Sequence, residues 1–247
     1  MPQPNAAGGT PHRPLLLPEF AGEPRPPLAG LTVLAVEDSR YACDAMRLMC
    51  QRLGARFRRA DTLAGARAHL RTYRPDVVIV DLGLPDGRGE VLIRDLTMQT
   101  LWQVAVIGIS GDPAGRQAAL AAGAVGFLEK PLPGLRAFAE MLGHHLPARR
   151  LTGLAPPLPD AASRISPDPL ALQDDLVQAA RVLDRQPDAR TRSFVARFVG
   201  GVARAAGDLA LTQAAHQAET GTESASLPLR TLLDDRLARP AAFIAPD

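Results

Sequence analysis

Side chains that could handle a phosphoryl group stand just after four apolar runs of the chain. Glu37 and Asp38 follow LTVLAV, Asp81 ends DVVIVD, Ser110 follows QVAVIGI, and Lys130 comes soon after VGFL. Carboxylates that converge repel one another and need a cation, and Mg²⁺ suits them because it prefers oxygen ligands. Beside such an ion Asp81 could attack phosphorus, while a hydroxyl and an ammonium contact the phosphoryl oxygens. These residue types therefore predict a Mg²⁺-dependent phosphoryl acceptor, provided that the fold brings them together.

The elements that would position these side chains alternate along the chain. We expect strands at 31–36, 55–60, 76–81, 103–109 and 125–128, and helices at 39–53, 63–72, 90–100, 113–122 and 132–145. Strict alternation of this kind is typical of a parallel sheet covered by helices on both faces. In such a sheet the carboxyl ends of the strands share one edge, and ligands bind there. The candidate residues would meet at that edge.

Each candidate also has a simpler interpretation. Glu37 and Asp38 could be an acidic pair that favours the dipole of the following helix, and Ser110 could cap the next helix. Phe127 could be an ordinary core residue. Lys130 is the single lysine among 28 basic residues, and a compact ammonium would be retained where a forked guanidinium does not fit. All of these residues stand near the ends of predicted strands, and this common position favours a shared phosphoryl site over the simpler interpretations.

Four motifs occur in an order and at a spacing that resemble one family. They are VEDS, VIVDLGLPDGRG, VIGISGD and GAVGFLEKP. Over residues 31–146 the chain resembles the receiver domain of two-component response regulators. The resemblance implies a five-stranded, doubly wound parallel sheet of the flavodoxin-like α/β class, with strand order 2-1-3-4-5.

The resemblance also implies a role for each site residue. Asp81 would accept a phosphoryl group from a histidine kinase or a phosphotransfer protein. The protein would not otherwise be an enzyme, because its chemistry would be limited to self-phosphorylation and autodephosphorylation. The remaining implied roles are Mg²⁺ ligands (Glu37, Asp38, Asp81 and the backbone carbonyl of Gly83), phosphoryl contacts (Ser110 and Lys130), switch residues (Ser110 and Phe127) and a cis peptide bond at Pro131.

Proline-rich stretches divide the chain into four parts. Residues 1–27 contain eight prolines and predict a disordered leader, residues 28–147 form the receiver, and residues 148–168 are a second proline-rich stretch that predicts a linker. Residues 169–240 predict a small helical domain. We expect its helices over 170–183, 203–218 and 229–237. A further helix is expected where apolar residues at helical spacing run up to the Gly200–Gly201 pair.

The function of the helical domain stays open at this point. Residues 151–247 carry 10 basic and 12 acidic side chains, and this balance argues against DNA as a partner. We expect output through protein contacts with a downstream target, and homodimerisation is possible. One alternative is a transcription regulator with a DNA-binding C-terminal domain. Another is a phosphotransfer or phosphatase module with His216 as its histidine, although the lysine and glycine that usually follow such a histidine are absent.

The sequence also predicts where the protein resides. It has no apolar run long enough to cross a membrane and no signal-peptide pattern. Cys43 and Cys50 stand seven residues apart on one expected helix, about 10 Å along its axis at 1.5 Å per residue. A disulfide does not span that distance. We therefore expect a cytoplasmic protein with free thiols and no membrane insertion.

Overall fold

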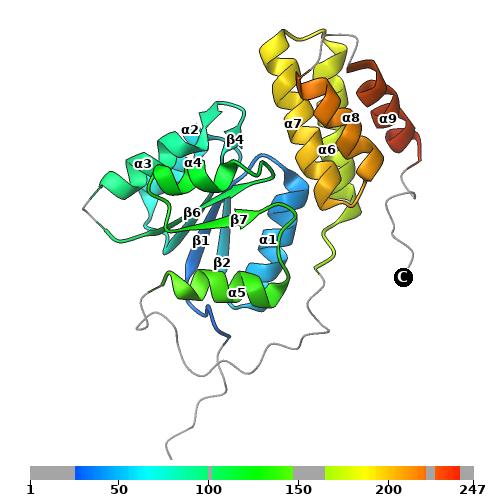
Figure 1. Ribbon diagram of the computed structural model, residues 1–247. Helices are drawn as coiled ribbons and strands as arrows, with labels where there is room; N and C mark the ends of the chain where they lie inside the picture. Colours follow the sequence, from blue (N-terminus) through cyan, green and yellow to red (C-terminus); the bar gives the residue numbers. More distant parts are fainter. Residues whose placement is uncertain (1–25, 100–101, 147–164, 221–225, 240–247) are drawn as a thin grey trace, which may run out of the picture.

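The computed structural model describes residues 26–99, 102–146, 165–220 and 226–239. Residues 1–25 of the predicted leader (1–27) and residues 148–164 of the predicted linker lie outside these residues. Within them, the chain forms an α/β domain followed by a group of helices (Figure 1). No helix in the described part is both long and apolar enough to cross a membrane.

The first domain is built around a five-stranded parallel sheet. Its strands are β1 (Thr32–Val36), β2 (Arg56–Ala60), β3 (Val77–Asp81), β6 (Ala105–Ser110) and β7 (Gly126–Glu129), in the order β2-β1-β3-β6-β7. Counted among the sheet strands alone, this is the predicted order 2-1-3-4-5. The β3 sequence VVIVD is buried at every position, as expected for a central strand that is covered on both faces.

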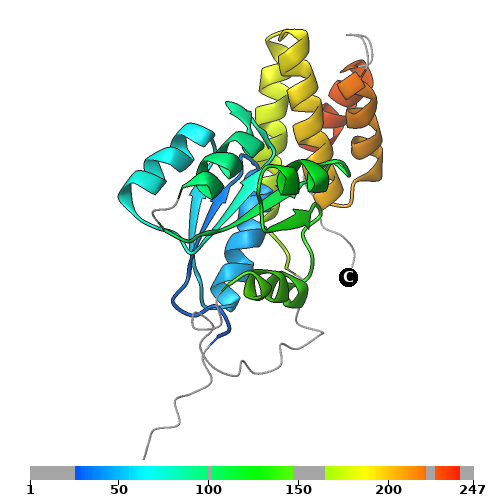
Figure 2. The ribbon, with the colours of Figure 1, turned by 60° about the vertical axis from the view of Figure 1, so that its left-hand side comes forward.

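Helices cover both faces of this sheet (Figure 2). The helices α1 (Arg40–Arg52) and α5 (Leu135–His144) pack on one face over a core that includes Met46 and Phe138. The helices α2 (Leu63–Thr72), α3 (Gly89–Met98) and α4 (Gly115–Ala121) cover the other face over Leu92 and Ile93. The domain is therefore a doubly wound sheet with two cores. Cys43 and Cys50 are free and buried in the first core.

Several features of this domain differ from the sequence expectation. The helix expected at 132–145 begins only at Leu135, and the strand expected at 103–109 begins at Ala105. The loop GLPDGRG contains a short antiparallel ribbon of β4 (Gly83–Leu84) and β5 (Gly87–Arg88). The helix expected at 113–122 begins only at Gly115, because Asp112 and Pro113 belong to the turn before it, where the backbone N–H of Gly115 donates to the carbonyl oxygen of Asp112.

The described residues after 165 form four helices, namely α6 (Pro169–Asp184), α7 (Ala189–Ala205), α8 (Leu209–Thr220) and α9 (Ser226–Ala238). Contacts join α6 to α7, α7 to α8, α8 to α9 and α9 back to α6, so the four form a closed bundle. Its core contains Leu176, Val199, Leu211 and Leu233. We call this group of helices the bundle.

The expected helix boundary at the Gly200–Gly201 pair is wrong. α7 continues through both glycines to Ala205, and α8 begins at Leu209. A Cβ on Gly200 would lie 3.4 Å from the Cβ of Ala215, so the glycine allows α7 and α8 to pack closely. The chain turns instead at Gly207, whose φ of 76° suits glycine, and at Asp208, whose side chain caps the N–H of Leu211.

Candidate phosphoryl acceptor site

Three carboxylates gather at the carboxyl edge of the sheet. Glu37 and Asp38 stand in the turn after β1, and Asp81 is the last residue of β3, the neighbouring strand. One oxygen from each of the three side chains lies within 4.8 Å of the others. Glu37 is 1% and Asp81 7% exposed, so water screens their mutual repulsion poorly.

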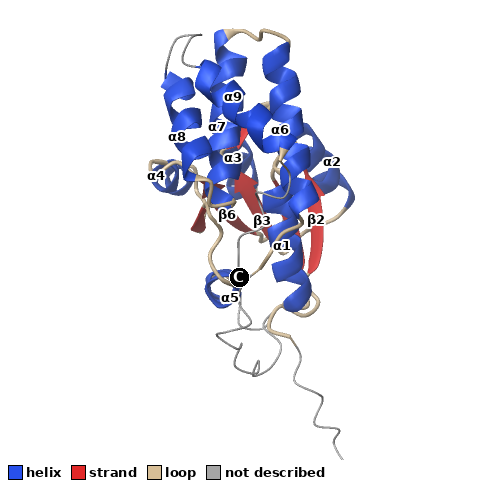
Figure 3. Ribbon diagram, turned by 90° about the vertical axis from the view of Figure 1, so that its right-hand side faces the viewer, coloured by secondary structure: helices blue, strands red, loops and turns tan. Residues whose placement is uncertain are grey.

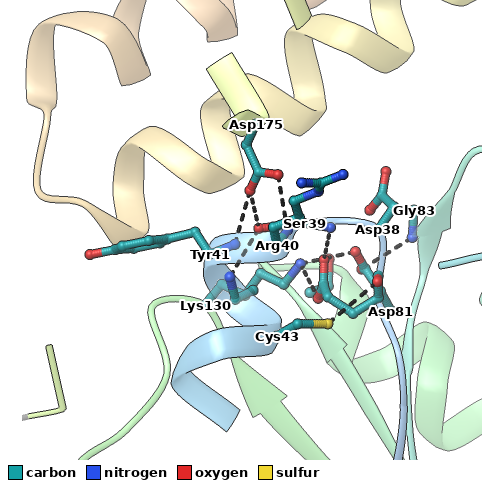
Figure 4. A network of polar contacts seen from close by, with 12 residues as sticks. Asp38, Ser39, Arg40, Tyr41, Cys43, Asp81, Gly83, Lys130 and Asp175 are labelled. Carbon is teal, nitrogen blue, oxygen red and sulfur yellow. Dashed lines mark hydrogen bonds and ion pairs between the residues drawn. The ribbon is translucent and has the colours of Figure 1, made fainter. Parts of the chain in front are cut away.

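Lys130 lies among these carboxylates. It follows β7, and its Nζ is 2.9 Å from Oδ2 of Asp81 and 2.7 Å from Oε2 of Glu37 (Figure 4). Its side chain is only 10% exposed. The structure thus places an ammonium against the predicted acceptor oxygen, 49 residues away in the sequence.

Burial and like charge shift the ionisation of the two acids after β1. Burial raises the pKa of Glu37 to about 8, the charges of Asp81 and Asp38 add to the rise, and Lys130 opposes it. Burial followed by the charge of Asp81 raises the pKa of Asp38 to about 7. Burial alone would lower the pKa of Lys130, but Asp81 and Glu37 raise it above its ordinary value. A divalent cation would relieve this crowding of negative charge.

Ser110 and Phe127 come from the neighbouring strands β6 and β7. Ser110 is 9% exposed, and its Oγ accepts a hydrogen bond from the backbone N–H of Asp112 at 3.0 Å. It does not cap α4, which has no side-chain cap. Its hydroxyl hydrogen is thus still available to a phosphoryl oxygen. Phe127 is 8% exposed and packs in the second core, with the guanidinium of Arg116 5.4 Å from its ring centre.

The loop after β3 approaches Asp81 closely. The backbone N–H of Gly83 donates to Oδ1 of Asp81 at 3.2 Å. A Cβ on Gly89 would lie 2.1 Å from the carbonyl oxygen of Asp81, so this position requires glycine. On the other side of the site the Lys130–Pro131 peptide bond is cis.

The bundle adds a wall that the sequence motifs did not indicate. A cavity of about 1180 Å³ is lined by the acidic residues, Ser110 and Lys130 on one side. On the other side its lining includes Arg197 and Arg204 of α7 and His216 of α8. These three belong to no motif, because they approach the site only when two separately folded parts come together.

Comparisons with known proteins identify the family of the α/β domain. The family model of the response regulator receiver domain matches residues 33–141. Residues 33–141 form a response regulator receiver domain. The match includes all the site residues from Glu37 to Pro131.

The sequence relatives share the receiver domain only in part of their length. The KDP operon transcriptional regulatory protein KdpE of Escherichia coli is 38% identical over 99 residues, which is 40% of this chain and 44% of the relative. The DNA-binding transcriptional activator DevR/DosR of Mycobacterium tuberculosis is 38% identical over 78 residues, 31% of this chain and 36% of the relative. The chain therefore spans less than half of these relatives. Their names do not support the expectation that DNA is excluded as a partner.

Solved structures also resemble the receiver domain. The receiver domain of the sensor histidine kinase PA1611 from Pseudomonas aeruginosa, which has magnesium in its active-site cleft, is 24% identical with a TM-score of 0.44. The chemotaxis protein CheY4 of Vibrio cholerae is 26% identical with a TM-score of 0.43. Each covers 47% of this chain and 98% of its own.

Proposed function

We propose that the protein is a phosphorylation-controlled signalling protein whose receiver domain accepts a phosphoryl group on Asp81 in a Mg²⁺-dependent reaction. The donor would be a histidine kinase or a phosphotransfer protein. The observation that supports this most strongly is the contact of Lys130 with Asp81 and Glu37 inside a cluster of three acids. The free, buried cysteines are consistent with a cytoplasmic location.

The donor set fits a magnesium ion. Glu37, Asp38 and Asp81 offer carboxylate oxygens within 4.8 Å of one another, and the carbonyl of Gly83 is the fourth protein ligand that we propose. Hard oxygen donors of this kind suit Mg²⁺, which keeps the remaining positions for water or phosphoryl oxygens. When bound, the ion would neutralise charge on the transferring group.

The residues of the chain divide the remaining chemistry. An oxygen of Asp81 forms a bond to phosphorus while the bond from phosphorus to the donor nitrogen breaks, which gives an acyl phosphate. Lys130 donates hydrogen bonds to the phosphoryl oxygens, and its contact with Oδ2 of Asp81 supports this role. Ser110 donates from its free hydroxyl. We propose that Ser110 and Phe127 then shift and pass the change to other surfaces of the protein.

Intact mass measurement tests this proposal. With phosphoramidate and Mg²⁺ we expect one phosphoryl adduct on the wild-type protein, none without Mg²⁺ and none on Asp81→Asn. The exposed Asp95 of α3, which pairs with Arg67, provides the control variant Asp95→Asn, which should behave like the wild type. An adduct of unchanged rate and stoichiometry on Asp81→Asn would refute the proposal.

A second candidate function concerns the bundle. His216 is exposed on α8 and lines the same cavity as Asp81. This placement favours a phosphotransfer role for the bundle over DNA binding, although the residues that usually follow a phosphorylated histidine are absent. When the phosphorylated protein is incubated, acid-labile label that appears in the wild type and is absent from His216→Gln would support this phosphotransfer role. Label on Asp81 alone would leave the bundle as an output or interaction module.

A further inference from the structure

The bundle is docked on the edge of the receiver where the acceptor site opens. α6 and α7 contact α1, and α7 also contacts β4, directly after Asp81. Figure 3 shows the bundle above the sheet, at the end where the acceptor site lies, with α5 toward the opposite end.

Asp175 of α6 is the central contact. It is 4% exposed. Its carboxylate accepts hydrogen bonds from Oγ of Ser39 at 2.9 Å, from N–H of Arg40 at 2.9 Å and from N–H of Tyr41 at 3.1 Å (Figure 4). The first N–H groups of a helix have no partner within the helix. Asp175 therefore caps α1 from another domain, directly after Glu37 and Asp38.

Other contacts surround this cap. The side chain of Tyr41 packs against the bundle core, which adds an apolar anchor. The backbone N–H of Asp168 donates to Asp44 at 2.9 Å. Arg40 pairs with Asp174 at 2.6 Å, but both side chains are more than half exposed, so this pair contributes little. The buried Asp175 is the charged group whose loss would cost most.

α7 then spans the mouth of the site. Near its C-terminal end, Nη1 of Arg204 donates to the carbonyl oxygen of Gly111 at 2.7 Å, next to Ser110. Seven residues earlier, Cδ of Arg197 is 3.9 Å from the point where a Cβ on Gly83 would lie. Gly83 and Gly111 follow the neighbouring strands β3 and β6. α7 therefore contacts both of the loops that border Asp81.

We propose that the bundle is a cover of the acceptor site, held closed by Asp175, that admits small phosphodonors and excludes donors carried on a protein. The cavity of about 1180 Å³ that remains beneath α7 is large enough for a small phosphorylated molecule. A phosphohistidine on another protein gains access only when the contacts of Asp175 break. This inference rests on the proposed function of Asp81.

The test compares two donors on full-length variants. Asp175→Asn removes the charge that caps α1, and its neighbour Asp174→Asn is the matched control because it breaks only an exposed pair. Phosphoramidate is the small donor, and a histidine phosphotransfer protein with labelled phosphohistidine is the large one. In both reactions the bond from phosphorus to nitrogen breaks, Asp81 gains the phosphoryl group, and the leaving nitrogen takes up a proton.

We expect Asp175→Asn to accelerate transfer from the protein donor about tenfold or more, since hydrogen bonds to a buried charge are lost. Its rate with phosphoramidate should stay within about twofold of the wild type, because the small donor never needed the cover to open. The radius of gyration from small-angle scattering should increase. Asp174→Asn should match the wild type in all three measurements.

Four outcomes are decisive. If Asp175→Asn accelerates transfer equally from both donors, or does not accelerate it from the protein donor, the proposal that the bundle covers the site is refuted. Failure of phosphoramidate to modify even the wild type would instead refute the proposed function. If Asp175→Asn loses its helical circular dichroism, Arg204→Ala replaces it, because this side chain is exposed and donates a hydrogen bond to the receiver at Gly111. If folded Arg204→Ala accepts the phosphoryl group from the protein donor at the wild-type rate, the proposal is also refuted.

Discussion

At the scale of single residues, the site depends on charges that burial prevents from being screened. Glu37, which is buried, and Asp38, which is half-buried, have raised pKa values because each is partly withdrawn from water and lies close to Asp81. Lys130 is the counter-charge, and it contacts both Glu37 and Asp81. The three carboxylates thus form a crowded anionic cluster around Lys130, and both protons and Mg²⁺ can relieve it.

Protons should therefore compete with Mg²⁺. The pKa values of about 8 for Glu37 and about 7 for Asp38 lie above those of the unfolded chain, so both groups bind protons more readily in the folded protein and release them as the pH rises. Each displaced proton can change the apparent affinity by up to about tenfold per pH unit. Calorimetry should show tighter Mg²⁺ binding at pH 8 than at pH 6. Glu37→Gln should bind more weakly and with a smaller pH dependence, and equal affinity at both pH values would contradict this.

Lys130→Arg tests whether charge alone is sufficient at this position. The side chain of Lys130 is 10% exposed, and its Nζ lies between two carboxylates. A forked guanidinium is too large to keep both contacts there. We expect the rate of phosphorylation by phosphoramidate to fall about a hundredfold, the usual cost of losing one donor to a developing anionic oxygen. The exposed Arg71→Lys is the control. A variant as fast as the wild type would show that any cation serves.

At the scale of elements, the site depends on how closely helices pack on the sheet. α4 lies on β6 at Gly108, where a Cβ would be 2.5 Å from the Cβ of Ala119 and 3.3 Å from Phe127. Ser110 lies two residues further along the same strand. Any change that lifts α4 from β6 therefore also disturbs the strand that carries the phosphoryl contact.

Two glycine substitutions should have opposite effects on the free energy of unfolding, because the space around the two glycines differs. Gly108→Ala forces Ala119 and Phe127 away, and we expect it to lower the free energy of unfolding by about 1–3 kcal/mol. Gly201→Ala, in α7, meets nothing within 4 Å and should raise it by about 0.5–1 kcal/mol through helix propensity. Urea denaturation measures both. A stable Gly108→Ala would mean that α4 can move at little cost.

At the scale of the whole molecule, the receiver and the bundle share one interface. The N–H groups of Arg40 and Tyr41 in the receiver are capped by Asp175 of the bundle. Hydrogen exchange of the amides of Arg40 and Tyr41 should therefore report the stability of α6, because those two amides have no partner within their own helix.

Leu176→Ala should show this coupling. Leu176 is fully buried in the bundle core, beside Asp175 in the sequence, and its truncation should cost about 2–5 kcal/mol. We expect hydrogen exchange at Arg40 and Tyr41 to accelerate as α6 opens more often. Leu227→Ala, at a leucine that is 67% exposed, is the control and should leave these amides unchanged. Unchanged exchange in Leu176→Ala would indicate that the two parts do not communicate.

The sequence by itself determined most of the receiver domain. Five apolar runs alternate with helical segments, and the polar residues that follow them meet at one sheet edge because parallel strands point the same way. The bounds of the helices in the bundle were harder to predict from the sequence. The Gly200–Gly201 pair indicated a boundary, but burial of Val199 and Val202 in the bundle core favours a continuous helix there.

Only the tertiary structure decided what lies over the acceptor. Asp175 and Asp174 are adjacent acids on one helix, and no pattern separates them, yet one caps α1 in a buried interface while the other pairs at the surface. Arg204, one of 27 arginines, contacts the loop beside Ser110. Local spacing encodes contacts within an element or along a sheet edge. Contacts between two independently built surfaces depend on their complementary shape and charge, which exist only after each has folded.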